Sequence, residues 1–170
     1  MSALADWRGR IAVGVVVLGT TVALTVGTGS SAGAGGAGCN GRAATIVGTA
    51  EAETIYGTDG ADVITGGAGS DKIYGLGGDD LVCGNRGNDY LAGGSGDDTL
   101  FGGKGSDSLD AGSGDDLLFA GDGSDALFGG SGQDLLTADD QITYPNDSCD
   151  GGDGSDDIAR NDCEATSNVP

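Results

Sequence analysis

A nine-residue period covers more than half of the chain and limits what it can fold into. From Gly48 the sequence divides without insertion into ten blocks of nine residues, which end at Thr137. In every block position six is acidic and position eight is aliphatic, and position four is glycine in all blocks but the first, which has Glu51. The residues at position six are Glu53, Asp62, Asp71, Asp80, Asp89, Asp98, Asp107, Asp116, Asp125 and Asp134. Because a disordered segment has no reason to keep aliphatic residues in phase, the period predicts a repeat architecture rather than a flexible acidic linker.

Positions seven to nine of each block predict a short strand. Side chains alternate between the two faces of an extended chain, so only position eight, the uniformly apolar one, points toward a core. Positions one to six are mostly glycine and small polar residues, which suit a tight turn with positive φ. If two blocks make one coil and the coils stack, the aliphatic residues form two facing ladders and the strands pair in parallel. The pattern predicts an all-β fold, a parallel β-roll (a β-helix or solenoid) over residues 48–137.

Composition indicates that burial of apolar side chains does not suffice to hold this roll together. The 170 residues include 27 Asp and Glu, seven Lys and Arg and no His, and the formal net charge is −20. One aliphatic side chain for every nine residues offsets little of the conformational entropy lost on folding. The acidic side chains also repel one another when the chain becomes compact. We therefore expect a cation in the turns to supply the missing stability.

Calcium is the cation that the available ligands suit best. It takes six to eight oxygen ligands from carboxylates and backbone carbonyls and tolerates irregular geometry, whereas magnesium demands a regular octahedron and keeps its water. Zinc and copper sites are built from His or thiolate, and the chain has no His and only four Cys. The sequence predicts several calcium ions and a fold that forms when they bind, because the sites do not exist in the open chain.

The blocks resemble the haemolysin-type, or RTX, calcium-binding nonapeptide G-G-x-G-x-D-x-U-x. The resemblance covers residues 48–137 and a separate eleventh block at 151–159. It implies a right-handed parallel β-roll in which calcium lies between turns one coil apart and position six supplies carboxylate oxygen. Two columns of five turns would hold at most about eight ions. The implied metal ligands are Asp62, Asp71, Asp80, Asp89, Asp98, Asp107, Asp116, Asp125 and Asp134.

Some blocks depart from this consensus. The first block has Glu51 and Glu53 in place of Gly and Asp, so we expect a cap or a weak site there. Leu76 and Asn85 replace the second glycine of their blocks, which we expect to be a mild change. The same expectation holds for two alanines that replace the first glycine, Ala111 and Ala120.

Residues 1–34 predict a secretory signal peptide. Arg8 and Arg10 precede an apolar stretch at 11–26, and a tract of small residues follows, with an A-x-A cleavage pattern that ends at Ala34. A charged segment, an apolar segment and a small-residue site in this order are typical of export signals. The expected localisation is therefore secreted, or extracellular.

Two other interpretations of the N-terminal segment fit less well. As a membrane anchor, the apolar stretch would span about 24 Å of a hydrocarbon core of about 30 Å. As a lipoprotein signal ending at Cys39, it would have Gly36 where such a signal has Leu. We expect no membrane insertion once the signal peptide is removed.

The four cysteines predict disulfides in an exported chain, for which three pairings exist. Cys149 and Cys163 bracket the eleventh block, and closing this short loop is worth about 3 kcal/mol on the chain-entropy model, so this pair is favoured. Cys39 and Cys83 then remain for each other. Their pairing requires residues 39–47 to fold back as an N-terminal cap.

Residues 138–170 form a predicted disulfide-bonded tail that contains the eleventh block. In the nonapeptide frame Asp156 takes position six, but the block stands alone, and the sequence leaves open whether the tail binds an additional ion. Four tail residues also match the ligand spacing of an EF-hand loop: Asp153, Ser155, Asp157 and Glu164. Ile158 in place of the obligatory glycine disfavours that alternative.

The leading functional prediction is a secreted, non-enzymatic calcium-binding protein that acts as a structural or cell-surface module. The acidic charge excludes nucleic acid as a natural partner. A calcium-dependent adhesin for a cell-wall or extracellular glycan is the alternative, since aromatic residues recur at position nine: Tyr56, Tyr74, Phe101, Phe119 and Phe128. A third possibility is an accessory module of an extracellular enzyme. The biological partner, the number of ions and the oligomeric state do not follow from the sequence.

Overall fold

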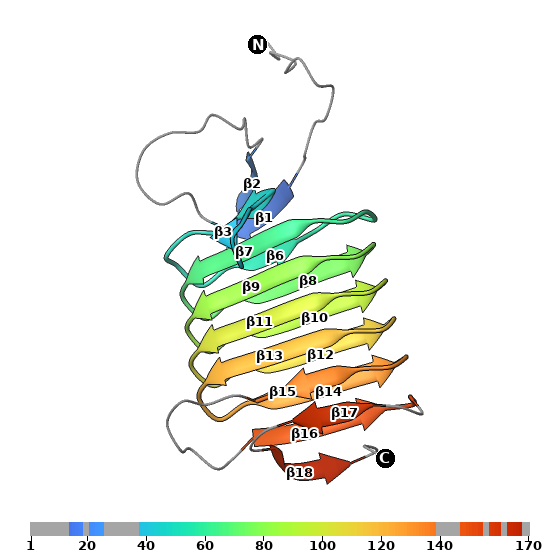
Figure 1. Cartoon of the computed structure of the whole chain (residues 1–170). Helices are drawn as coiled ribbons and strands as arrows, with labels where there is room; N and C mark the ends of the chain where they lie inside the picture. The colour runs from blue at the N-terminus through green and yellow to red at the C-terminus, as the bar shows by residue number, and fades with distance from the viewer. Residues whose placement is uncertain are drawn as a thin grey trace.

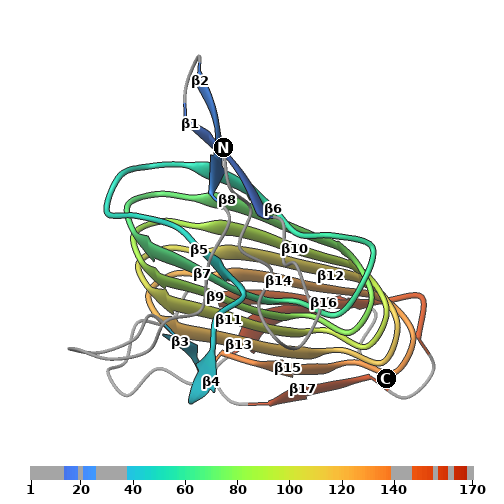
Figure 2. The same ribbon diagram turned by 90° about the horizontal axis from the view of Figure 1, so that it is seen from above.

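The protein folds into two parallel β-sheets that face each other across a thin core, with the coils stacked along one axis (Figures 1 and 2). The structure, a computed structural model, describes residues 14–18, 21–25, 38–138, 147–154, 157–160 and 163–167. These residues form strands and turns and no helix, so none of them belongs to a helix that could span a membrane. The predicted all-β parallel roll is confirmed.

Successive strands alternate between the two sheets, so that each coil contributes one strand to either sheet. In the nine-stranded sheet the parallel strands are β6 (Thr54–Tyr56), β8 (Lys72–Gly77), β10 (Tyr90–Ser95), β12 (Ser108–Ser113), β14 (Ala126–Ser131), β16 (Asp147–Gly152) and β18 (Cys163–Ser167). In the seven-stranded sheet they are β5 (Ile46–Val47), β7 (Val63–Ala68), β9 (Leu81–Arg86), β11 (Thr99–Lys104), β13 (Leu117–Asp122), β15 (Leu135–Thr137) and β17 (Ile158–Arg160).

Within the repeat, paired residues are two blocks apart, as Tyr90 and Ser108 are in β10 and β12. The strands are longer than the three residues predicted for each block. Positions two and three also pair with the next coil, for example Gly94 with Gly112, so a full strand has six residues. The turns are correspondingly tighter than the sequence suggested.

The core consists of the position-eight residues, as predicted. Every one of them has zero exposed area: Ile55, Ile64, Ile73, Val82, Leu91, Leu100, Leu109, Leu118, Leu127 and Leu136. Ala111 and Ala120, which replace glycine at position one, are also fully buried in this cluster. Ile46 before the repeat and Cys149 after it extend the same cluster at its two ends.

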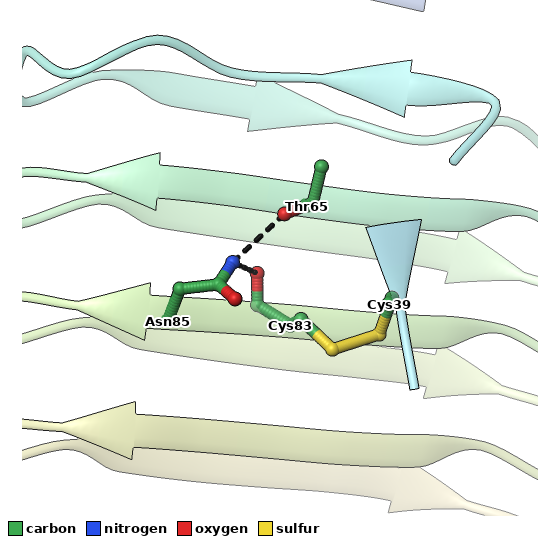
Figure 3. The surroundings of a disulfide bond; sticks show 4 residues. All are labelled: Cys39, Thr65, Cys83 and Asn85. Atoms are coloured by element: carbon green, nitrogen blue, oxygen red, sulfur yellow. Dashed lines mark hydrogen bonds between the residues drawn. A yellow bond between two sulfur atoms is a disulfide. The ribbon is translucent and has the colours of Figure 1, made fainter. Parts of the chain in front are cut away.

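A small antiparallel hairpin, β3 (Gly38–Cys39) and β4 (Arg42–Ala43), lies against the outer face of the seven-stranded sheet (Figure 2). A disulfide joins Cys39 to Cys83 on β9, as Figure 3 shows, so the favoured pairing of these two cysteines is confirmed. Cys39 forms a second apolar cluster with Val63, Leu81 and Cys83. The hairpin thereby covers outward apolar side chains of the first coils.

The segment predicted as an export signal contains a second antiparallel hairpin, β1 (Gly14–Leu18) and β2 (Thr21–Thr25). Strand β1 pairs with the free edge of β6, with Val15 opposite Tyr56. Ala34, the predicted end of the cleavage pattern, lies outside the described residues. Export stays a prediction.

The roll continues into the tail with a changed spacing. Ala126 of β14 pairs with Ser148 of β16, 22 residues later, and Leu135 of β15 pairs with Ile158 of β17, 23 residues later, instead of the usual 18. The second offset shifts the eleventh block by one residue, so Asp157 rather than the predicted Asp156 occupies position six. The physical reason is an extra residue in the turn before β17, which the nonapeptide frame did not allow for.

Cys149 is disulfide-bonded, and no cysteine in the described part of the chain is free. The side chain of its predicted partner, Cys163, lies outside the described residues, as do residues 155–156.

Candidate metal sites

The position-six carboxylates form two continuous ladders, one along each line of turns. In both ladders the backbone amide of one acidic residue donates a hydrogen bond of 2.7–3.0 Å to Oδ1 of the next, one coil further on. The first ladder comprises Glu53, Asp71, Asp89, Asp107, Asp125 and Asp147. The second comprises Asp62, Asp80, Asp98, Asp116, Asp134 and Asp157. All twelve side chains are buried, with at most 8% of their area exposed.

The second carboxylate oxygen has no such partner in most of these residues. Oδ2 is buried and accepts no hydrogen bond in Asp71, Asp80, Asp89, Asp98, Asp107, Asp116, Asp134 and Asp157. A buried ionised oxygen without a partner is costly, because nothing replaces the water that it has lost. A row of such oxygens, one in each of these turns, points to a positive ligand that recurs along the ladders.

Backbone carbonyl oxygens approach the same places. A Cβ added to Gly66, at position one, would lie 2.7 Å from Asp71 Oδ2 and 3.0 Å from the carbonyl oxygen of Gly84 in the next coil. At Gly102 the added Cβ would lie 2.5 Å from Asp107 Oδ2 and 2.6 Å from the carbonyl oxygen of Ala120. Carboxylate and carbonyl oxygens from neighbouring coils therefore converge at these turns, where position one is glycine.

This donor set fits calcium. Within the described part of the chain, no three Asp, Glu, Cys or His side chains come together as a metal site, so an ion held in these turns would take its remaining ligands from backbone carbonyls. Calcium accepts mixed carboxylate and carbonyl ligands, whereas zinc and copper require His or thiolate, which these turns lack.

Burial raises the pKa of the ladder carboxylates. The pKa of Asp80, Asp107 and Asp116 rises from 3.8 to about 7, and that of Asp71 and Asp98 to about 6. The pKa is also raised by burial in Asp89 and Asp134. The accepted amide hydrogen bond lowers each pKa, but by less than burial raises it. Burial therefore makes protonation of these carboxylates easier than that of a solvent-exposed aspartate.

The first turn of each ladder differs from the others. Oε2 of Glu53 accepts a hydrogen bond from the amide of Thr49 and Oε1 accepts one from its hydroxyl, at 2.9 and 2.7 Å. Asp62 Oδ2 accepts hydrogen bonds from the amide and the hydroxyl of Thr58, both at 2.8 Å, and its Oδ1 accepts one from Thr45 at 3.2 Å. Threonine thus takes the role at the N-terminal end that a cation would take elsewhere.

All nine predicted ligands lie in the two ladders, but they are not equivalent. Asp62 is the predicted ligand whose carboxylate is satisfied by threonine, a distinction that Thr at position two of its block could have signalled. Sequence reasoning missed Asp147 and named Asp157 only within the disfavoured EF-hand alternative, because both lie outside the regular period. The ligand role of every residue in the ladders stays a prediction.

A parallel solenoid with a buried acidic ladder along each line of turns defines a calcium-binding repeat protein. The family model that matches the chain is the RTX calcium-binding nonapeptide repeat (four copies of the repeat). It matches residues 47–82, 84–118 and 101–136. The chain belongs to this family, as its blocks predicted. No curated protein matches the chain significantly.

Proposed function

We propose that the chain is a secreted calcium-binding protein whose roll forms when calcium binds, and that it acts as a structural or cell-surface module. The observation that carries this proposal is a set of buried Oδ2 atoms without hydrogen-bond partners, beside carbonyl oxygens of the next coil; they belong to Asp71, Asp80, Asp89, Asp98, Asp107, Asp116 and Asp134. Family membership supports calcium as the ion. The proposal includes no catalytic step.

Calcium concentration would control folding of the exported chain. A ligand that binds only the folded state stabilises it in proportion to the logarithm of its concentration. Extracellular calcium modules work at about 10⁻⁴–10⁻³ M, far above the free calcium inside cells. The chain would stay open during synthesis and fold outside the cell, with up to about eight ions in the repeat.

A calcium titration of purified residues 35–170, followed by far-UV circular dichroism, tests the proposal. We expect the β signal to appear between about 10⁻⁴ and 10⁻³ M calcium and to vanish after removal of the ion with EGTA. Magnesium at the same concentration is the control and should produce little change. A full β signal in EGTA, or an equal response to magnesium, would contradict the proposal.

The alternative is a calcium-dependent adhesin for a cell-wall or extracellular glycan. Its support is the outward aromatic side chains: Tyr56 stacks on Tyr74 with ring centroids 5.1 Å apart, and Phe101 stacks on Phe119 at 4.8 Å. These two pairs lie on opposite sheets, so they form two short files rather than one. Retention on insoluble cell-wall glycan in calcium, and release by chelator, would favour adhesion. An accessory role beside an extracellular enzyme is a third candidate.

A further inference from the structure

The second acidic ladder extends one coil beyond the recognised repeat. The family match ends at residue 136, yet Asp157 lies at position six of the next coil, directly before strand β17. Its Oδ1 accepts a 2.9 Å hydrogen bond from the backbone amide of Asp134. This bond has the geometry that links every earlier pair in the ladder, such as Asp116 and Asp134 at 3.0 Å.

The Asp157 carboxylate is buried and only half satisfied. The side chain is 3% exposed, and Oδ2 has no hydrogen-bond partner. The carboxylates of Asp134 and Asp157 also repel each other electrostatically. No basic side chain in the described part of the chain forms an ion pair with either of them. An uncompensated pair of buried carboxylates is unfavourable unless a cation lies nearby.

A backbone carbonyl oxygen of the neighbouring coil lies close to each of the two carboxylates. A Cβ added to Gly154 would lie 2.6 Å from Asp157 Oδ2 and would also collide with the carbonyl oxygen of Gly132. At Gly129 the added Cβ would lie 2.7 Å from the carbonyl oxygen of Gly151 and would collide with Asp134 Oδ2. The last repeat therefore supplies a carbonyl oxygen near Asp157, and the tail supplies one near Asp134.

The two ends of the ladder are built differently. At the N-terminal end, Thr58 satisfies the carboxylate of Asp62 through its amide and hydroxyl. At the C-terminal end, Oδ2 of Asp157 has no such threonine or other donor in the described residues. A carboxylate that merely capped the roll would be expected to have protein donors for both oxygens, as Asp62 has.

We propose that Asp157 is a calcium ligand in the tail, at a site outside the recognised repeats, and that this ion docks strand β17 onto β15. The inference rests on the proposed calcium function but goes further, since it assigns a ligand to the irregular last coil. The amide of Ile158 reports on the docking, because it donates a 2.8 Å hydrogen bond to the carbonyl oxygen of Asp134.

Native mass spectrometry of the purified chain in calcium tests the site. Asp157→Asn removes the charge but keeps an acceptor for the Asp134 amide, so we expect one calcium ion fewer than in the unmodified chain. Asp153→Asn, at an exposed residue of the same turn, is the matched control and should leave the count unchanged. Asp98→Asn is the positive control, because it shows how many calcium ions are lost when a ligand of a regular site is replaced.

The outcomes separate this inference from the proposed function. If Asp98→Asn loses an ion and Asp157→Asn loses none, the tail site is wrong and the proposed function stands. If the unmodified chain binds no calcium, both are wrong. The site is supported if Asp157→Asn binds fewer calcium ions than the unmodified chain while Asp153→Asn binds the same number.

Hydrogen exchange on the unmodified chain guards against a variant that simply fails to fold. The Ile158 amide should gain protection when calcium is added, in step with strand β11 in the repeat. In Asp157→Asn that gain should be lost at β17 and kept at β11. Protection of Ile158 that is equal with and without calcium would overturn the inference.

Discussion

The backbone amide of Asp80 donates a 2.8 Å hydrogen bond to Oδ1 of Asp98, while Oδ2 of Asp98 is buried without a partner. One carboxylate thus does two different things. Its first oxygen accepts the hydrogen bond that links it to the preceding coil, and its second is the oxygen that we expect to bind a cation. Asparagine keeps the first role and loses the charge needed for the second, so substitutions of this kind can separate folding from metal binding.

Without metal, the folded roll should lose stability as pH rises. The pKa of Asp80 and Asp116 is raised to about 7 in the folded chain, against about 3.9 for an unfolded aspartate. Between these values the folded state binds more protons than the unfolded state, so the free energy of unfolding falls with increasing pH. Far-UV circular dichroism of chelated and desalted protein should show more residual β signal at pH 5 than at pH 8.

With calcium, the dependence on pH should reverse. Calcium competes with the proton for the same carboxylates, so the apparent affinity should rise from pH 5 to pH 8 and protons should be released on binding. Isothermal titration calorimetry in two buffers of different ionisation enthalpy measures that release. A calcium affinity that does not change over this range would contradict the role of these carboxylates as ligands.

The threonine-satisfied turn should hold no ion of its own. We expect Asp62→Asn to leave the number of bound calcium ions unchanged, because Thr58 already donates to the Asp62 carboxylate. Asp80→Asn, one coil further on, should lower the number, because Oδ2 of Asp80 has no donor. Native mass spectrometry of the two variants side by side makes the comparison, and equal losses would show that the threonine contacts do not replace a cation.

Glycine at position four should be indispensable in the regular turns and dispensable in the second block. Gly114 has φ of 139°, and a Cβ there would collide with the carbonyl oxygen of Gly96, so Gly114→Ala should cost at least about 1–2 kcal/mol. Gly60 has no neighbour within 4 Å of an added Cβ, and Gly60→Ala should stay within about 0.5 kcal/mol. Urea unfolding in saturating calcium measures both, and equal costs would contradict the difference between the turns.

The fold could be predicted from the sequence because one constraint is repeated in phase. The aliphatic residue at position eight has to face the core in every block, and all ten of these side chains are fully buried. The strand length was underestimated, since the residues at positions two and three, such as Gly94 and Ser95, are mostly glycine or polar and carry no apolar signal although their backbone pairs with the next coil.

The candidate site was predicted less completely. Position six identifies which aspartates face inward, but not which oxygens are already satisfied, so Asp62 could not be told from Asp80 without the hydrogen bonds of Thr58. Asp157 could not be found from the period, because an extra residue in the turn before it shifts the phase. The pairing of β15 with β17 in the structure is what shows that Asp157 lies at position six, next to Asp134.

Two residues that depart from the consensus at position two should respond in opposite ways to glycine. Leu76 has φ of 82° and is 46% exposed. Its left-handed conformation is unfavourable, and its side chain makes few packing contacts that could offset this cost. Asn85 has φ of 79°, but its amide nitrogen donates a 2.8 Å hydrogen bond to the hydroxyl of Thr65 (Figure 3). A leucine in the left-handed region costs about 1–2 kcal/mol of stability. Glycine avoids this cost, but part of the gain is cancelled because glycine loses more conformational entropy on folding. We therefore expect Leu76→Gly to stabilise the roll by up to about 1 kcal/mol and Asn85→Gly to be neutral or destabilising, as urea unfolding in calcium would measure. A destabilised Leu76→Gly would mean that the leucine side chain packs usefully despite its exposure.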